Sequence, residues 1–323
     1  MIGAFCRTAG VLLLWAGLIP VGFSVQQNVS GVVGGVSHQA MQQNFESFRQ
    51  ARESGQLELP FSLDSLLNSS ESHASVRYFL DGVSLDEFRQ RLDQPAEWCE
   101  FIPLHLNIKA CSHLQRGDLT LVRFYAGIKG YVAPDKAHLL ELQFNSEVRD
   151  GVYLVKLFAE DGPLDSSNLG FIVRAIDINR DGWQGMYLEF EVSSDPGLAA
   201  NLARLYLATI ARKKVGFSAE GKTWTGKPAY VTGQRGATER NIVRYLLAIE
   251  TYFDTLGLPE DERYLRRLER WFDATEKFHR QLYELPREEY LENKLLEREN
   301  QKILQQAIAD GTQPDFSPVD RRR

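Results

Sequence analysis

The chain has 323 residues, of which 43% are hydrophobic and 25% charged, and its formal net charge is −6. This composition is typical of soluble globular proteins, and the length allows two domains. The negative net charge gives no electrostatic support for binding nucleic acid, and the basic ending 321–323 is too short to change that. We therefore expect no nucleic-acid partner.

Residues 1–24 have the pattern of a secretory signal peptide. Arg7 precedes an apolar run over 9–23, and the small residues Gly22 and Ser24 permit cleavage after Ser24. The run is shorter than the ~20 residues that a membrane-spanning helix needs, although an uncleaved anchor is the alternative. The sequence thus predicts a periplasmic or secreted protein that is not an integral membrane protein after cleavage.

Removal of the signal peptide leaves two cysteines, Cys99 and Cys111. An even number of cysteines in an oxidising compartment favours a disulfide. The alternative is a pair of buried free thiols.

The first part of the mature chain mixes a helix, strands and two short helices. Residues 25–56 form an N-terminal extension with a helix over 38–52, and strands are expected over 57–67 and 74–80. Ser84 and Glu87 form a capping box that starts one short helix, and Pro95 starts the next.

A run of strands follows with no helix between them. The strand-like segments are 105–111, 119–126, 138–145, 152–158, 171–176 and 186–192. Turn residues such as Asp150-Gly151 and Asp181-Gly182 separate several of them, as hairpins require. Apolar and polar residues alternate along three of the segments, so the sequence predicts an antiparallel sheet with one packed and one wet face.

Residues 197–214 change to helical spacing, with apolar residues three and four apart. We expect a linker over 219–236, a helical region over 237–310 and a disordered tail over 311–323. The predicted fold class is α+β, with a curved antiparallel sheet wrapped around a long helix and additional helices at the C-terminus.

This order of elements, together with the segment Trp98-Cys99-Glu100-Phe101 to Cys111, resembles the START-like (helix-grip) superfamily of lipid-transfer proteins and polyketide cyclases. The segment is also similar to one in uncharacterised exported proteobacterial proteins. The resemblance applies to residues 57–218, most clearly from 75 onward. It implies a cavity between sheet and helix for a lipid or other hydrophobic small molecule, and it carries over no catalytic residue.

The alternating faces provide candidate walls for such a cavity. The predicted ligand-binding residues are Phe124, Leu142, Phe144, Leu188, Phe190, Leu202 and Tyr206. A fully packed core without a ligand is the alternative, because periodicity indicates burial and does not reveal voids.

Three further motifs do not have the context that their chemistry needs. Residues 216–223 match a phosphate-binding loop but follow a helix, and residues 177–182 begin like a calcium loop that has Leu188 at its twelfth position. Cys99, His105, Cys111 and His113 lack the usual zinc-ligand spacing. We therefore predict no metal and no cofactor.

The sequence favours a protein that binds or carries a hydrophobic molecule over an enzyme. One alternative is an interaction or scaffold protein that docks a protein partner through helices 237–310. The other is a cyclase-like enzyme with an acid/base site at His105, Arg123 or Arg174.

Overall fold

The computed structural model describes residues 37–68, 70–162, 166–195, 197 and 214–320. The predicted signal peptide 1–24 and nearly all of the predicted helix 197–214, including Leu202 and Tyr206, lie outside these residues. The described residues belong to one compact unit.

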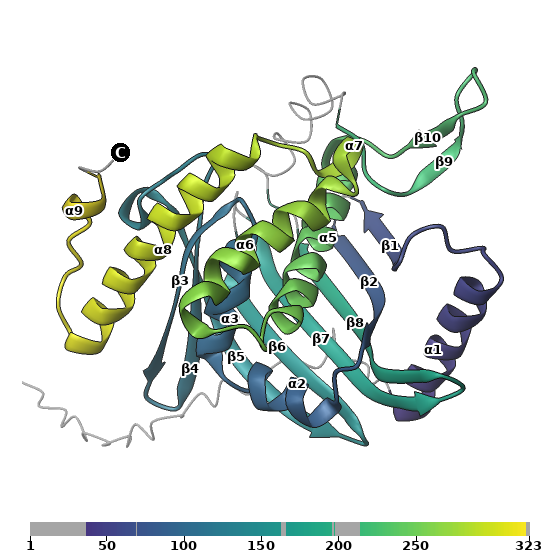
Figure 1. The fold of residues 1–323 in the computed structure, drawn as a ribbon, viewed down its shortest axis with the longest axis horizontal. Helices are drawn as coiled ribbons and strands as arrows, with labels where there is room; N and C mark the ends of the chain where they lie inside the picture. The colour runs from purple at the N-terminus through teal and green to yellow at the C-terminus, as the bar shows by residue number, and fades with distance from the viewer. Residues whose placement is uncertain (1–36, 69, 163–165, 196, 198–213, 321–323) are drawn as a thin grey trace, which may run out of the picture. The chain divides into compact units, whose positions relative to one another are not determined.

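The central element is an eight-stranded antiparallel sheet with the strand order β1-β2-β8-β7-β6-β5-β4-β3 (Figure 1). The strands are β1 Ser62–Leu67, β2 Ser72–Asp81, β3 Ile108–Arg116, β4 Leu119–Ala126, β5 His138–Arg149, β6 Val152–Asp161, β7 Ser167–Arg180 and β8 Trp183–Asp195. Strands β3 to β8 pair with their neighbours in sequence, and β2 pairs with β8.

Two of the predicted hairpin turns have the backbone that their residues favour. Asp150 and Gly151 join β5 to β6, and Asp181 and Gly182 join β7 to β8, all with positive φ angles. A two-residue turn in which both residues have positive φ angles matches the right-handed twist of the two strands that it joins. The calcium-loop-like segment 177–182 is therefore the end of β7 and the turn into β8, in agreement with the predicted turn between strands.

Helices occur on both sides of the sheet. They are α1 His38–Glu53, α2 Leu85–Leu92, α3 Pro95–Phe101, α5 Gly233–Asp254, α6 Glu260–Glu276, α7 His279–Leu282, α8 Arg287–Asp310 and α9 Ser317–Asp320, with 3₁₀ turns η1 Ile102–Leu104 and η2 Pro134–Lys136. The Ser84 hydroxyl accepts the Glu87 N–H and starts α2, as the capping box predicts. No helix in the described ranges is long and apolar enough to cross a membrane.

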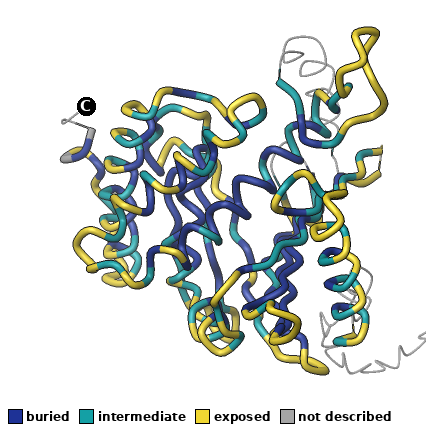
Figure 2. Tube along the Cα trace, turned by 45° about the vertical axis from the view of Figure 1, so that its right-hand side comes forward, coloured by how far each residue is buried: buried dark blue, intermediate teal, exposed yellow. Residues whose placement is uncertain are grey.

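The long helix α5 lies on one face of the sheet, which we call the inner face (Figure 1). Its buried residues include Ile242, Val243, Leu246 and Ile249, and they belong to the same hydrophobic core as the inner-face strand residues. Figure 2 shows the buried positions concentrated in the strands and in this helix. The α+β fold class, with an antiparallel sheet and a long helix in a helix-grip arrangement, is therefore confirmed.

The helix on the inner face is not the segment expected from the sequence. The expected helix 197–214 lies outside the described residues, and α5 begins within the predicted linker, whose other residues include the hairpin β9 Ala219–Lys222 and β10 Pro228–Tyr230. Helix α5 is buried on most sides because it is covered by the sheet, by α3 and by α6.

The outer face of the sheet is covered in part by α1. Phe45 and Phe48 of α1 pack against Trp183 and Tyr187 of β8 with ring centroids 5.6 to 6.4 Å apart. Asn44 donates a hydrogen bond to Glu189. This helix lies in the predicted N-terminal extension.

Part of the tail that the sequence predicts to be disordered, residues 311–320, contains α9 and packs on the rest of the chain. Phe316 is buried against Ala110, Tyr125 and Leu304, and Val319 is buried beside Tyr131. Burial of these two isolated apolar side chains holds α9 next to α8 and β3.

Candidate functional site

The structure brings together the five predicted ligand-binding residues that it describes. Phe124, Leu142, Phe144, Leu188 and Phe190 all lie on the inner face and belong to one core. They come from β4, β5 and β8. The role of these residues in binding a ligand stays a prediction, as does that of Leu202 and Tyr206.

Four rings meet at the centre of the interface between sheet and α5, and we call them the aromatic cluster: Phe124, Phe171, Phe190 and Tyr245. The centroid of Phe171 in β7 lies 5.7 Å from that of Phe124, 6.5 Å from that of Phe190 and 5.7 Å from that of Tyr245 in α5. Most of these contacts are edge to face, the arrangement that aromatic quadrupoles favour.

Two members of the aromatic cluster, Phe171 and Tyr245, were not predicted from the sequence as ligand-binding residues. Strand β7 is apolar on both faces, so alternation did not assign Phe171 to either of them. Tyr245 belongs to the helical stripe after residue 237, whose spacing predicted burial but not the surface that buries it.

His105 borders the aromatic cluster on the side of η1. Its ring stacks on Tyr245 with centroids 4.6 Å apart, and the residue is 1% exposed. The backbone N–H of Asn107 donates to His105 Nδ1 over 3.1 Å. Nε2 is buried and makes no hydrogen bond within the described part of the chain.

The His105 imidazole is neutral at pH 7. Burial holds its pKa well below the usual value, and the positive charges of Arg244, Lys294 and Lys109 act in the same direction. The Asn241 side chain beside the ring opposes this shift, and its amide oxygen, which has two acceptor sites, also accepts from Arg244. Because Nδ1 accepts a hydrogen bond, the single ring proton lies on Nε2. His105 therefore presents a buried N–H donor.

The lowered pKa of His105 predicts that the folded chain loses stability as the pH falls below about 6.5, the usual histidine value. The unfolded chain then binds a proton that folded His105 does not bind. Between pH 7 and 5 the free energy of unfolding of wild type should fall more steeply than that of His105→Phe, by up to about 1.4 kcal/mol per pH unit. Urea titrations at several pH values measure this, and parallel pH profiles would contradict it.

A buried ion cluster, Lys109, Lys294 and Glu297, fixes the backbone around His105. Lys294 Nζ donates to the carbonyls of His105 and Ile108 and to Glu297 over 2.7 to 3.0 Å. Lys109 Nζ donates to Glu297 over 3.1 Å, and burial lowers the pKa of Lys109 to about 8. The cluster thus attaches the segment between η1 and β3 to helix α8.

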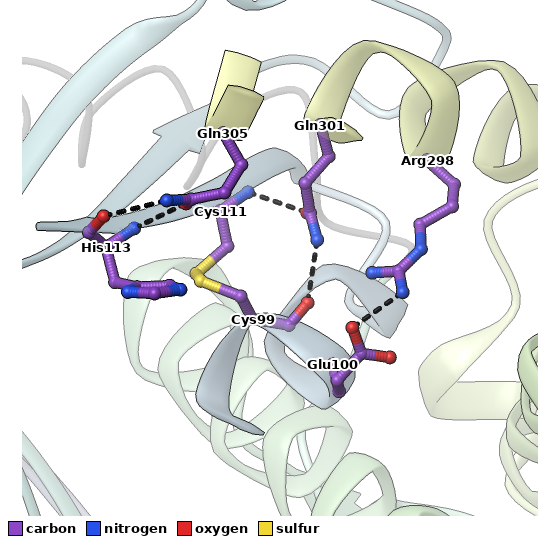
Figure 3. The surroundings of a disulfide bond; sticks show 7 residues. All are labelled: Cys99, Glu100, Cys111, His113, Arg298, Gln301 and Gln305. Carbon is purple, nitrogen blue, oxygen red and sulfur yellow. Dashed lines mark hydrogen bonds and ion pairs between the residues drawn. A yellow bond between two sulfur atoms is a disulfide. The ribbon is translucent and has the colours of Figure 1, made fainter. Parts of the chain in front are cut away.

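The predicted disulfide between Cys99 and Cys111 is confirmed, and it joins α3 to β3 (Figure 3). The Gln301 side chain of α8 accepts the N–H of Cys111 and donates to the carbonyl of Cys99. Gln305 accepts the N–H of His113 and donates to its carbonyl.

These two glutamines satisfy backbone groups of the edge strand β3. They are one helical turn apart, about 6 Å along the axis, and Cys111 and His113 are about 6.6 Å apart along the strand. Because these two spacings are similar, glutamines one turn apart on one face of α8 can hydrogen-bond the backbone of every second residue of β3. Helix α8 thus covers an edge that would otherwise expose free N–H and C=O groups.

Replacement of both Cys99 and Cys111 by alanine should lower the free energy of unfolding by about 3 kcal/mol, because the bridge closes a loop between residues 12 apart in sequence. Urea unfolding under oxidising conditions measures the loss. Wild type under reducing conditions is the matched control and should approach the variant. Equal stability of wild type and variant before reduction would contradict the prediction.

An open cleft of about 1060 Å³ lies among α3, α6 and α8 and is lined by side chains of both signs of charge. Glu100 accepts from Arg267 and Arg298, and the Arg298 guanidinium lies 4.6 Å from the centroid of the Tyr264 ring. The cleft is charged and contains none of the predicted ligand-binding residues.

The residues considered for an acid/base site are not brought together. Arg123 pairs with Glu141 and Arg174 with Glu191, both on the outer face, whereas His105 is on the inner side. The phosphate-loop-like segment 216–223 contains strand β9 and is followed by β10, not by a helix. Among the described residues, no group of three or more His, Cys, Asp or Glu side chains is placed to hold a metal ion.

No protein-family model matches this sequence, and a search of curated proteins finds no match. Among solved structures, the chain is similar to human STARD10, with 12% sequence identity and a TM-score of 0.29. That similarity covers 52% of this chain and 76% of the other.

Proposed function

We propose that this protein binds or carries a hydrophobic small molecule or lipid between the inner face of the sheet and α5. The observation that carries the proposal is the aromatic cluster, in which rings from β4, β7, β8 and α5 converge. Ligand sites are mostly apolar, with a few polar groups that orient the ligand. Apolar burial supplies about 25 cal/mol per Å², so such a surface is suited to a ligand of low polarity.

The order of elements supports assignment to the START-like superfamily. Two short helices, α2 and α3, separate β2 from an unbroken run of six strands, and a long helix then lies on the sheet. In this proposal the protein sequesters its ligand and carries out no chemical step on it.

Titration of the full chain with Nile red, an uncharged apolar dye, tests the proposal. Wild type should bind the dye saturably, and Phe190→Asp should bind it at least about tenfold more weakly, because a buried charge disfavours an apolar ligand. Leu119→Asp is the matched control, because Leu119 is exposed on β4. Phe190→Ala removes the ring without introducing a charge, and circular dichroism of both variants shows whether weaker dye binding comes from the lost ring or from unfolding. Absent binding by wild type, or unchanged binding by folded Phe190→Asp, would contradict the proposal.

The proposal places the protein in the periplasm or outside the cell. The apolar run at 9–23 supports export, and the Cys99–Cys111 disulfide supports an oxidising compartment. Cell fractionation with N-terminal sequencing tests this: we expect the mature chain to begin at Val25 outside the cytoplasm. A cytoplasmic chain that begins at Met1 would contradict it.

A protein partner that docks on helices 237–310 is the second candidate. The charged cleft favours it, because Leu265 and Leu295 are both 42% exposed beside its Arg and Glu side chains. A partner retained by wild type and lost by Leu265→Asp and Leu295→Asp would support docking there. A partner retained by both variants would contradict it.

A further inference from the structure

We propose that the hairpin of β9 and β10 docks the protein on an anionic lipid surface, with Trp224 at the boundary between water and lipid and with Lys222 and Lys227 beside the lipid headgroups. The inference goes beyond the proposed function and does not depend on a ligand between sheet and α5. Three observations carry it: a fully exposed indole, a hairpin tip closed by its own hydrogen bonds, and positive charge on both sides of that tip.

Trp224 is the most exposed large apolar side chain of the described residues, at 98%. All residues over 219–228 are exposed, and Figure 1 shows the hairpin extending away from the sheet. A two-stranded hairpin by itself is only marginally stable, and an indole in water adds no burial to it. Trp224 therefore contributes nothing to the core. Its ring, apolar with one polar N–H, suits the boundary between water and an apolar phase.

The tip of the hairpin, residues 223–226, is closed by its own hydrogen bonds. The Gly226 N–H donates to the Thr223 carbonyl over 2.9 Å, and the Thr223 N–H donates to the Lys227 carbonyl over 2.7 Å. The hydroxyls of Thr223 and Thr225 bond to each other over 2.9 Å. Where lipid replaces water, polar groups without partners are costly. A turn that bonds to itself therefore loses less when it approaches lipid.

Positive charge flanks the tip, although the chain as a whole has a net charge of −6. Lys222 and Lys227 stand directly before and after it, and both are exposed. Residues 221–238 include no Asp or Glu, and Glu220 pairs with Arg235. Lysine is depleted in protein–protein interfaces, whereas lysines beside an anionic bilayer attract it. The charges around the indole therefore favour an anionic lipid surface over a pocket in a protein partner.

Two further exposed apolar side chains lie at the same end of the sheet, Ile128 at 75% and Tyr283 at 42%. Lys129, next to Ile128, donates to the carbonyl of the residue after Tyr283. The Arg280 guanidinium of α7 lies 4.6 Å from the centroid of the Tyr230 ring in β10. These contacts place both apolar side chains around α7 at the base of the hairpin. A lipid surface that faces this end thus has apolar contacts besides Trp224.

Co-flotation with vesicles of equal parts phosphatidylglycerol and phosphatidylcholine tests the proposal. The mature chain from Val25 is used, because the apolar run 9–23 would bind lipid by itself. Trp224→Ser should bind these vesicles at least about tenfold more weakly than wild type. Leu119→Ser is the matched control and should bind as wild type does, because Leu119 is an exposed apolar residue at the opposite end of β4 from the loop with Ile128.

A second variant tests the charge. Lys222→Gln combined with Lys227→Gln should weaken binding to the anionic vesicles about thirtyfold, at about fivefold per lysine, and should leave binding to pure phosphatidylcholine vesicles unchanged. Equal weakening on both vesicle types would overturn the assignment to anionic lipid. All three positions are exposed, so the variants should keep the circular dichroism of wild type.

The outcomes separate this inference from the proposed function. Wild type that does not bind the anionic vesicles would overturn the inference and leave Trp224 to a protein partner. Equal vesicle binding by wild type and Trp224→Ser would overturn it as well. Uptake of Nile red by Trp224→Ser should equal that of wild type. A wild type that binds vesicles through Trp224 but takes up no dye would contradict the proposed function and support this inference.

Discussion

Deletion of residues 237–323 is expected to abolish cooperative folding of the chain. The deletion removes α5 from residue 237 onward. This helix shares one hydrophobic core with β1, β2 and β8, so its loss exposes the core. Without it, inner-face side chains such as Val76 and Phe190 would be exposed to water, and burial of each such side chain is worth about 1.5–3 kcal/mol. Several such losses exceed the 5–15 kcal/mol that stabilises a typical domain.

Circular dichroism with thermal unfolding measures the effect of the deletion. A chain truncated after Asp310 is the matched control, since it loses buried Phe316 and Val319 but keeps α5 to α8, and it should retain a cooperative transition. If the helices after residue 237 were instead a separable docking region, the sheet would unfold cooperatively without them. That result would contradict the single core described here.

Replacement of Glu297 by glutamine is expected to lower the free energy of unfolding by about 3–5 kcal/mol. Its carboxylate accepts from Lys109 and Lys294, and all three side chains are at most 2% exposed. Removal of the negative charge leaves two buried ammonium groups without a counter-ion. Chemical denaturation measures the loss.

Glu292→Gln is the matched control for this substitution, because Glu292 lies on the same helix and is exposed. It should change the free energy of unfolding by less than about 0.5 kcal/mol. A triple variant with methionine at positions 109, 294 and 297 should recover much of the loss, since replacement of a whole buried ion cluster is far less costly than breaking it. Equal stability of Glu297→Gln and Glu292→Gln would contradict the role of the cluster.

The sheet could be predicted from the sequence because its signals are local. Alternation placed Phe124, Leu142 and Phe190 on one face, and the residue pairs Asp150-Gly151 and Asp181-Gly182 marked hairpin turns. The helix on the inner face could not be predicted, because helical spacing indicates a buried stripe and does not name its partner. Both 197–214 and α5 have such spacing, and the structure describes only α5 in full.

The site could be predicted only in part. The phenylalanines of β4, β5 and β8 follow from alternation, whereas Phe171 lies in a strand that is apolar on both faces. His105 was among the residues considered for catalysis, but its place beside the aromatic cluster is seen only in its burial and its stacking on Tyr245. None of these features has a signature in the sequence, since each depends on residues more than 100 positions away or on the packing of the whole core.

Native mass spectrometry of the full mature chain, purified without detergent from its native source, tests the central claim most directly. Binding of a hydrophobic ligand between sheet and α5 predicts one non-covalent adduct of defined mass per chain, released on denaturation and recovered in an organic extract. A chain that carries only its own mass, and that also takes up no apolar dye, would contradict the claim.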